Sequence, residues 1–377
     1  HDQAALLAAM GRSAAALSQL GLAREHWNAL DDATGAAETW LDQGWLLLAA
    51  GDHLAARRAF VAAAPALRPT PSSRWRNDYG LARCAELAGD AASAGAAYLR
   101  ACSVVGELRS RLRSETLSSA IFLQAEQLFV HALQHAVRGG DAEAALAIGE
   151  GQRALTLSRL LGAGPPELSG AHLQEREALL AELRQLATVP TLVAEPAPVL
   201  LAFGELLLSA RRQSRERTAA SGAIDDGPFD LAAARALLVA RYGQGWTVLA
   251  VLPLAEELVI VVVTPEATLL QREPLDEALE CLIEQGCDRA YRRYTYDDHA
   301  WLQGQAARPW QALEQLGARL IPPVVRERLG PDHRLIVLPA GPLHTLPWAA
   351  LRSDGAWLVE RAIVQVAPSL LALRRLN

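Results

Sequence analysis

The chain has 377 residues, of which 51% are hydrophobic, and a formal net charge of −6. This length and apolar content predict a folded protein of roughly two or three domains. The mildly negative charge argues against a general nucleic-acid binder, and the lack of an uninterrupted apolar run of about 18 residues argues against a membrane protein.

The N-terminus and the cysteines indicate a cytoplasmic protein. No basic segment followed by an apolar one marks an export signal. The sequence begins at His1 and its single Met is Met10, so we expect the natural start to lie upstream. The cysteines are Cys84, Cys102, Cys281 and Cys287. Their spacing is not typical of metal ligands, and we interpret them as buried thiols.

Two segments of the first half share one pattern at an offset of 38 residues. Trp40–Ala63 contains Gly51-Asp52, and Asp78–Ala101 contains Gly89-Asp90 at the equivalent place (89 − 51 = 38). The other matching positions are Gly44 with Ala82, Ala56 with Ala94, Phe60 with Tyr98, and Ala63 with Ala101. Small residues recur where two helices must approach closely, and aromatic residues recur where they must fill space. The pattern predicts a helix-turn-helix repeat.

A weaker third copy runs from Ser119 to Ala154 with Gly140-Asp141 at its turn, and a similar unit is expected before the first. The pattern resembles tetratricopeptide repeats, whose usual length is about 34 residues, and we assign the extra residues to a proline-rich connector, Pro65–Pro71. The resemblance implies a concave face that binds a protein or peptide. A helical bundle without a binding role is the alternative.

The middle of the chain is expected to be helical. Gln152–Leu161 is a basic and apolar segment typical of a helix. Leu173–Leu186 and Leu200–Arg217 are amphipathic and flank a proline-rich gap, so they predict a helical hairpin. The arginines at its end, Arg211, Arg212, Arg215 and Arg217, are interpreted as a solvated helix end rather than a basic binding patch.

Beyond this hairpin the hydrophobic period changes. Thr247–Leu252, Glu257–Thr264 and Ala267–Glu273 are rich in β-branched residues and separated by short turns, so they predict an antiparallel meander. Helices are expected at about Leu275–Gly286 and Pro309–Leu320.

Near the end of the sequence, Leu335–Leu338 and Ala362–Val366 are short apolar runs closed by proline, and they predict two buried strands. The prolines between them, Pro339, Pro342 and Pro347, fix φ and remove backbone donors, so this segment cannot continue a sheet. Its apolar residues are Leu343, Leu346, Trp348 and Leu351. We expect an apolar loop that packs onto the sheet it leaves.

This segment resembles the opening half of the CHAT domain, a caspase-like cysteine peptidase module usually found behind tetratricopeptide repeats. The matching residues are Leu343, Leu346, Pro347 and Trp348, followed after the next strand by Pro368-Ser369. The resemblance implies a multidomain chain with all-α repeats in 1–165, a helical linker hairpin in 166–228, and an α/β caspase-like domain, incomplete, in 229–377.

The catalytic residues of such a domain cannot be placed on this sequence. The mechanism needs a cysteine thiolate beside a histidine. In the family, the histidine lies in a His-Gly pair and the cysteine follows a strand, both downstream of Pro-Ser. No histidine here precedes glycine, so we expect both groups to lie beyond Asn377 or on another chain. We assign no catalytic residue, cofactor or metal ligand.

The candidate site-proximal loop is Pro342, Leu343, His344, Leu346, Pro347 and Trp348. It leaves the carboxyl end of a strand, where α/β proteins place their sites, although packing alone also explains it. His131 and His135 have the spacing of a two-histidine metal site but lack an evident third ligand. Arg289–Asp298 interleaves arginine with tyrosine, and we interpret it as a partner-facing or solvated loop rather than a base-stacking surface.

Two functions remain open. In the first, the chain is the N-terminal part of a bacterial caspase-like endopeptidase. Its repeats bind a regulator or protein substrate, and its partners include the remaining segment of the CHAT domain. The second is a non-enzymatic adaptor with a degenerate CHAT domain. A His-Gly pair and a strand-end cysteine in the reading frame beyond Asn377 would favour the first.

Overall fold

The computed structural model of the chain describes residues 2–111, 115–162, 174, 178, 229–291, 309–370 and 373. His1–Leu155 and Pro228–Arg374 form one compact unit, to which the description below refers, and Thr156–Gly227 with Arg375–Asn377 form another. The predicted linker hairpin and its arginine cluster lie outside the described residues, apart from Gln174 and Ala178. The same is true of the tyrosine-containing segment from 292 onward. The two predicted domain boundaries therefore stay predictions.

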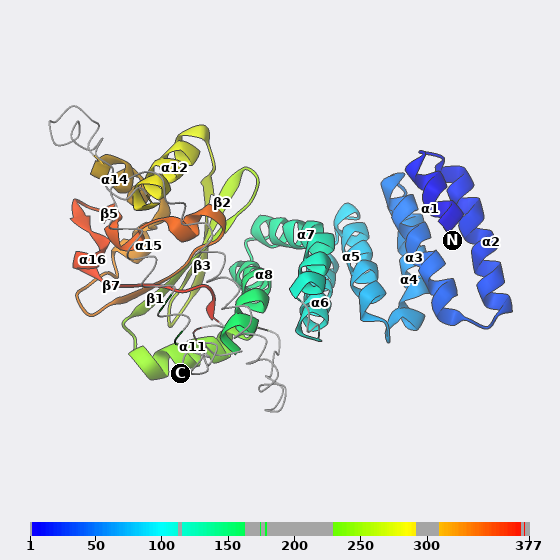
Figure 1. The fold of residues 1–377 in the computed structure, drawn as a ribbon, viewed down its shortest axis with the longest axis horizontal. Coiled ribbons are helices and arrows are strands. Elements are labelled where there is room, and N and C mark those ends of the chain that lie inside the picture. The colour runs from blue at the N-terminus through cyan, green and yellow to red at the C-terminus, as the bar shows by residue number, and fades with distance from the viewer. Residues whose placement is uncertain are drawn as a thin grey trace. The chain divides into compact units, whose positions relative to one another are not determined.

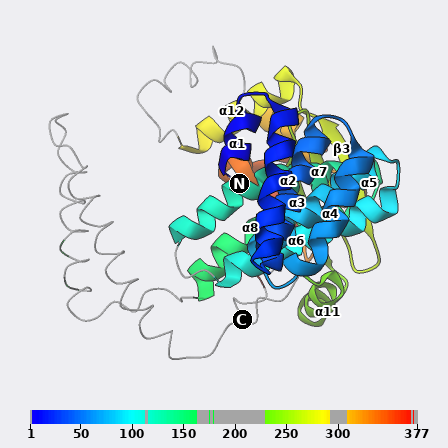
Figure 2. The same ribbon diagram turned by 90° about the vertical axis from the view of Figure 1, so that its right-hand side faces the viewer.

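The N-terminal part of this unit is helical, as predicted. Its helices are α1 (Asp2–Ala9), α2 (Ser13–Ala29), α3 (Ala33–Ala49), α4 (His53–Leu67), α5 (Pro71–Leu87), α6 (Ala91–Arg111), α7 (Glu115–Arg138) and α8 (Ala142–Gly162) (Figure 1). Figure 2 shows α1, α2, α3 and α4 side by side, each in contact with the next. The expected additional unit before the first repeat is α1 with α2.

Glycine followed by aspartate forms the corner inside each predicted repeat. The glycines have positive φ: Gly51 (+87°), Gly89 (+77°) and Gly140 (+68°). This left-handed conformation ends a helix and is accessible to glycine at little cost. The following aspartates cap the next helices by accepting a backbone N–H, Asp52 from Ala55 (2.9 Å), Asp90 from Ser93 (3.0 Å) and Asp141 from Ala144 (2.9 Å). Each such cap contributes about 1 kcal/mol.

The aligned small and aromatic residues are buried between the helices. Phe60 of α4 is fully buried. Its ring lies against Gly44 of α3 and Gly80 of α5, where an added Cβ would come within 2.5 and 2.3 Å of ring carbons. The matching small residues are also buried: Ala56, Ala63, Ala94 and Ala101. The two glycines thus leave the space that the aromatic ring fills.

The predicted connector Pro65–Pro71 was wrong. Helix α4 continues through Pro65 to Leu67, and Pro71 is the first residue of α5, where a missing N–H costs little. The separate helix predicted at Gln152–Leu161 is likewise the second half of α8. The extra length lies in the helices themselves, because the 38-residue offset from Gly51 to Gly89 spans α4 with 15 residues and α5 with 17.

The second part of the unit is a mixed sheet of order β3-β2-β1-β4-β7. Its strands are β1 (Trp246–Pro253), β2 (Glu257–Val263), β3 (Thr268–Pro274), β4 (Arg334–Leu338) and β7 (Ile363–Val366). The first three form the predicted antiparallel meander, with Val251 opposite Ile260 and Ile260 opposite Gln271. Strands β1, β4 and β7 are parallel. The predicted helices are α12 (Glu277–Tyr291) and α14 (Pro309–Leu320).

Both faces of the sheet are covered, which explains why its central strands are apolar throughout. On one face, β1 residues Val248, Ala250 and Leu252 share a core with α5–α8 and α11 (Leu231–Tyr242). On the other face, Leu249 and Val251 pack against α12 and α14. The small hairpin β5 (Arg352–Ser353) and β6 (Ala356–Trp357), with α15 (Pro323–Arg326) and α16 (Leu358–Arg361), completes this part.

The prediction of two buried strands holds for β4 but not for β7. The β4 residues Leu335–Leu338 are fully buried. In contrast, β7 lies at the edge of the sheet, and its Ile363 and Val366 are 43% and 50% exposed. Composition could not reveal this difference, because burial depends on whether a neighbouring strand is present.

Candidate functional site

The parallel strands β1, β4 and β7 end at one edge of the sheet, here called the carboxyl edge. Ligand sites of open α/β sheets commonly lie at this edge. The chain leaves β4 there through a segment with two short 3-10 helices, η2 (Gly341–Thr345) and η3 (Trp348–Ala350), and this segment contains the candidate loop.

The apolar side chains of this loop pack onto the sheet, as expected. Leu343, Leu346 and Trp348 are buried in the core that also holds Val337 of β4. The Trp348 indole Nε1–H donates to the Leu343 carbonyl at 3.0 Å, so the loop is closed by its own hydrogen bond. Pro342 lies at the start of η2 and Pro347 caps η3, where neither needs a backbone donor.

His344 is the only loop member of the predicted set with a titratable side chain, and it is exposed. The loss of hydration where the imidazole faces the protein, and then the positive charge of Arg153 on α8, lower its pKa. The imidazole is therefore biased toward the neutral form, which can accept a proton. This property suits a general base, but a base needs a nucleophile within hydrogen-bonding reach.

No hydrogen bond joins a cysteine thiol to a histidine among the residues that the structure describes. Burial raises the thiol pKa of Cys84 to about 11 and of Cys102 to about 12, so both stay protonated near neutral pH. Cys287 donates from its Sγ to the Pro342 carbonyl (3.4 Å), and Cys281 is exposed and accepts from Gln285. The expectation of buried thiols is thus wrong for Cys281, which lies on a solvent-facing side of α12.

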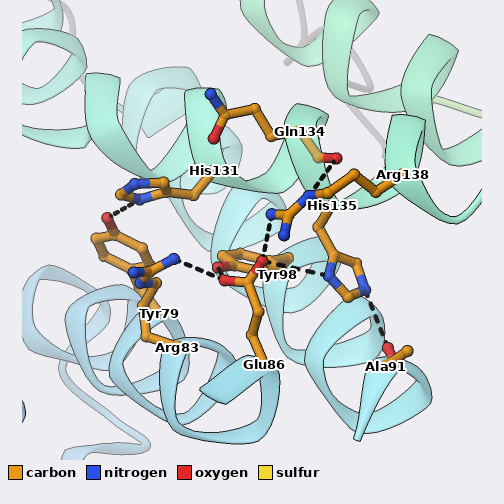
Figure 3. A network of polar contacts seen from close by, with 9 residues as sticks. All are labelled: Tyr79, Arg83, Glu86, Ala91, Tyr98, His131, Gln134, His135 and Arg138. Atoms are coloured by element: carbon orange, nitrogen blue, oxygen red, sulfur yellow. Dashed lines mark hydrogen bonds and ion pairs between the residues drawn. The ribbon is translucent and has the colours of Figure 1, made fainter. Parts of the chain in front are cut away.

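A second group of polar side chains joins the last two repeats, with Glu86 at its centre (Figure 3). The Glu86 carboxylate of α5 accepts from Arg83 (2.6 Å) and from the Tyr98 hydroxyl of α6 (2.7 Å), and Arg138 of α7 donates to its other oxygen at 2.5 Å. Burial acts to raise the pKa of Glu86, but these hydrogen bonds outweigh it and hold the pKa below its ordinary value. We call these residues the Glu86 cluster.

The two histidines of α7 have different partners. His131 Nδ1 lies 2.6 Å from the Tyr79 hydroxyl, whereas His135 Nε2 lies 3.0 Å from the Ala91 carbonyl. His135 Nδ1 lies 3.7 Å from Glu86. Within the described residues no group of three or more His, Cys, Asp or Glu side chains is arranged to hold a metal. The spacing of the two histidines is explained by helix packing.

A pocket of about 250 Å³ opens beside the cluster, lined by Glu86, Gly89, Ala91, His135, Arg138 and Gly139. Next to it, rings from three helices follow one another: Trp45 of α3 lies 5.1 Å from Tyr79 of α5, and Tyr79 lies 5.9 Å from His131 of α7 (centroid distances). These rings and the Glu86 cluster hold the first helices of successive repeats together and give that side of the stack its polar and aromatic character.

The Tyr79–His131 contact predicts acid sensitivity of the repeats. Burial raises the pKa of Tyr79 to about 12, so its hydroxyl donates to a neutral His131, whose own pKa is lowered by burial and by Arg83. Because this folded-state pKa lies below the unfolded value of about 6.5, the stabilisation is complete above that pH and is lost as the pH falls through the folded pKa. We expect His131→Gln to unfold in urea with a smaller loss of stability between neutral and acidic pH than wild type. The exposed control His26→Gln should keep the wild-type loss, and an unchanged loss in His131→Gln would exclude this role.

The sequence did not single out Glu86 or Arg153. Each is one charged residue among several on an amphipathic helix, and what distinguishes it is a partner on another helix or strand.

No helix in the described ranges has the length and apolar character needed to cross a bilayer.

Comparison with known proteins is informative for the last part of the chain. No curated protein matches the chain. The family model of the CHAT domain matches residues 311–377, which contain β4, the candidate loop and β7. The chain therefore carries helical repeats followed by an α/β sheet whose last part matches the CHAT domain.

Proposed function

We propose that the chain is the N-terminal part of a caspase-like cysteine endopeptidase. Its helical repeats bind a regulator or a protein substrate, and its catalytic histidine and cysteine are supplied by sequence beyond Asn377 or by another chain. The observation that carries this proposal is the CHAT match at 311–377, which coincides with the parallel strands β4 and β7 and the loop between them.

The two edges of the sheet support the idea that further strands join it at β7. The edge strand β3 is protected by charge, because Arg272 pairs with Glu257 (2.6 Å) and Glu273 pairs with Arg319 of α14. Edge strands of folded proteins commonly carry such charges. In contrast, β7 reads Ile-Val-Gln-Val and exposes Ile363 and Val366. An apolar edge strand that carries no charged side chain of its own is suited to pairing with a neighbour.

The repeats support the binding role. Their helices stack in pairs, and stacks of this kind bind proteins or peptides along the surface formed by the first helix of each pair. Here that surface is formed by α3, α5 and α7, which supply the ring series and the Glu86 cluster. We keep this assignment as a proposal about the class of partner, namely a protein or peptide.

The test compares the 377-residue chain with a longer protein read through beyond Asn377. We expect the 377-residue chain to leave a library of unstructured peptides intact and the longer protein to cleave it. Replacing the strand-end cysteine of the added segment by alanine should abolish cleavage, whereas Cys287→Ala in the same protein should not. Cleavage by the 377-residue chain that disappears in Cys287→Ala would overturn the proposal. An added segment without a His-Gly pair and a strand-end cysteine would favour the adaptor function instead.

A further inference from the structure

Helix α8 is packed directly against the sheet. Its residues Leu146 and Ile148 are buried in the same core as Ala250 of β1. Gly149 faces Leu252, and a Cβ added at Gly149 would lie 2.5 Å from Leu252 Cδ2. Because cores pack closely, a displacement of α8 toward the sheet must be followed by the end of β1.

Two charged side chains of α8 extend this contact. Glu150 is fully buried and its Oε2 accepts the Leu370 backbone N–H at 2.8 Å. The side chain of Arg153 is 7% exposed, and its Nη2 donates to the Val251 carbonyl at 2.5 Å. The two side chains lie 4.0 Å apart. Buried charged groups are costly without hydrogen-bonding partners, so the position of α8 and these two backbone groups stabilise one another.

Both backbone groups belong to the carboxyl edge. Val251 lies near the end of β1, one residue beyond Ala250, which is opposite Leu338 at the end of β4. Leu370 lies four residues after Val366, the last residue of β7 (370 − 366). The positive charge of Arg153 also lowers the pKa of His344, which lies in the loop after β4. One turn of α8 therefore contacts β1 near its end and the segment that follows β7, and it influences the loop that follows β4.

The other end of α8 offers a matched comparison. Glu143 lies 3.3 Å from the Thr268 hydroxyl of β3 and 3.7 Å from Arg235 of α11, and its side chain is 63% exposed. Thr268 is opposite Val263, which is opposite Val248 near the start of β1. This contact therefore lies away from the carboxyl edge.

We propose that Glu150 and Arg153 are positioning residues through which the helical repeats set the conformation of the carboxyl edge, so that a protein bound to the repeats alters this edge by displacing α8. The importance of the edge for peptide cleavage rests on the function proposed above, whereas the coupling itself is a property of the 377-residue chain.

Amide hydrogen exchange followed by mass spectrometry tests the first half of this proposal. In Glu150→Ala the Leu370 N–H loses its buried acceptor, and we expect the peptide covering residues 367–370 to exchange about tenfold faster than in wild type. Glu150→Gln keeps an acceptor oxygen and should restore most of the protection. Glu143→Gln should leave this peptide unchanged. Unchanged exchange at 367–370 in Glu150→Ala would overturn the proposal.

A double-mutant comparison tests whether the repeats act on the edge. Glu86→Ala loosens α5, α6 and α7, and we expect faster exchange both in α7 and at residues 367–370. In the Glu150→Ala background, Glu86→Ala should still act on α7 but add nothing at 367–370. If Glu150→Ala does not fold, Glu150→Gln serves as the background. In this background Glu86→Ala should still speed exchange at residues 367–370. Faster exchange in α7 with no change at 367–370 in Glu86→Ala alone would overturn the coupling. Because no cleavage is measured, an inactive longer protein would overturn only the proposed function.

Discussion

Phe60→Ala is expected to lower the free energy of unfolding by about 4 kcal/mol, measured by chemical denaturation. The Phe60 ring is fully buried and fills the space between Gly44 of α3 and Gly80 of α5. Removing it deletes apolar contacts with α3 and α5 and leaves a cavity that backbone atoms cannot easily close. Leu54 on the same helix is 61% exposed, so its substitution provides the control for Phe60→Ala. Leu54→Ala should change the stability by no more than about 0.5 kcal/mol.

The same site predicts a non-additive pair. Gly80→Ala introduces a Cβ 2.3 Å from the Phe60 ring, so we expect it to cost roughly 1–3 kcal/mol by overpacking. In the Phe60→Ala background the ring is absent, and the cost of Gly80→Ala should disappear. A cost that is the same in both backgrounds would show that Gly80 is not needed to accommodate the ring.

Gly317→Ala is the second large effect, with an expected loss of about 3 kcal/mol. Gly317 lies in α14 where this helix crosses β5, and an added Cβ would lie 1.9 Å from the Arg352 carbonyl oxygen. The obstacle is backbone, which cannot rotate away as a side chain can. We therefore expect α14 to be pushed off the small hairpin, which should lower the denaturation midpoint.

Gly21→Ala is the matched control for Gly317→Ala. Gly21 is also a helical glycine, in α2, but nothing lies within 4 Å of its added Cβ. The substitution should stabilise the chain by up to about 1 kcal/mol, because alanine has the higher helix propensity. If both substitutions changed stability in the same direction, propensity rather than the contact with Arg352 would decide the outcome at Gly317.

Local patterns predicted much of the fold. The Gly-Asp corners specify left-handed residues followed by helix caps, and both requirements act within a few residues of sequence. The apolar runs of β1, β2 and β4 do not alternate with polar residues, because both faces of the sheet are covered. Pro65 misled the prediction because a proline near the end of a helix resembles one that follows it.

The polar contacts between elements could not be predicted in this way. Glu150 and Leu370 are 220 residues apart in the sequence, and Glu86 and Arg138 are 52 apart. No spacing rule connects such pairs, because their proximity depends on the packing of whole helices and strands. The candidate loop could be predicted because its prolines and leucines lie close together in the sequence. The effect of Arg153 on the pKa of His344 could not be predicted in this way.

The order of strands in the sheet has a consequence for the protein during synthesis. The helical repeats and the β1–β2–β3 meander involve neighbours in the sequence and can form as each segment leaves the ribosome. Strand β1 must wait for β4, and the Thr247–His333 contact beside them closes a separation of 86 residues. Until β4 is translated, one side of β1 has no neighbouring strand. During this interval the backbone N–H and C=O groups on that side of β1 are unpaired, and other chains can pair with them.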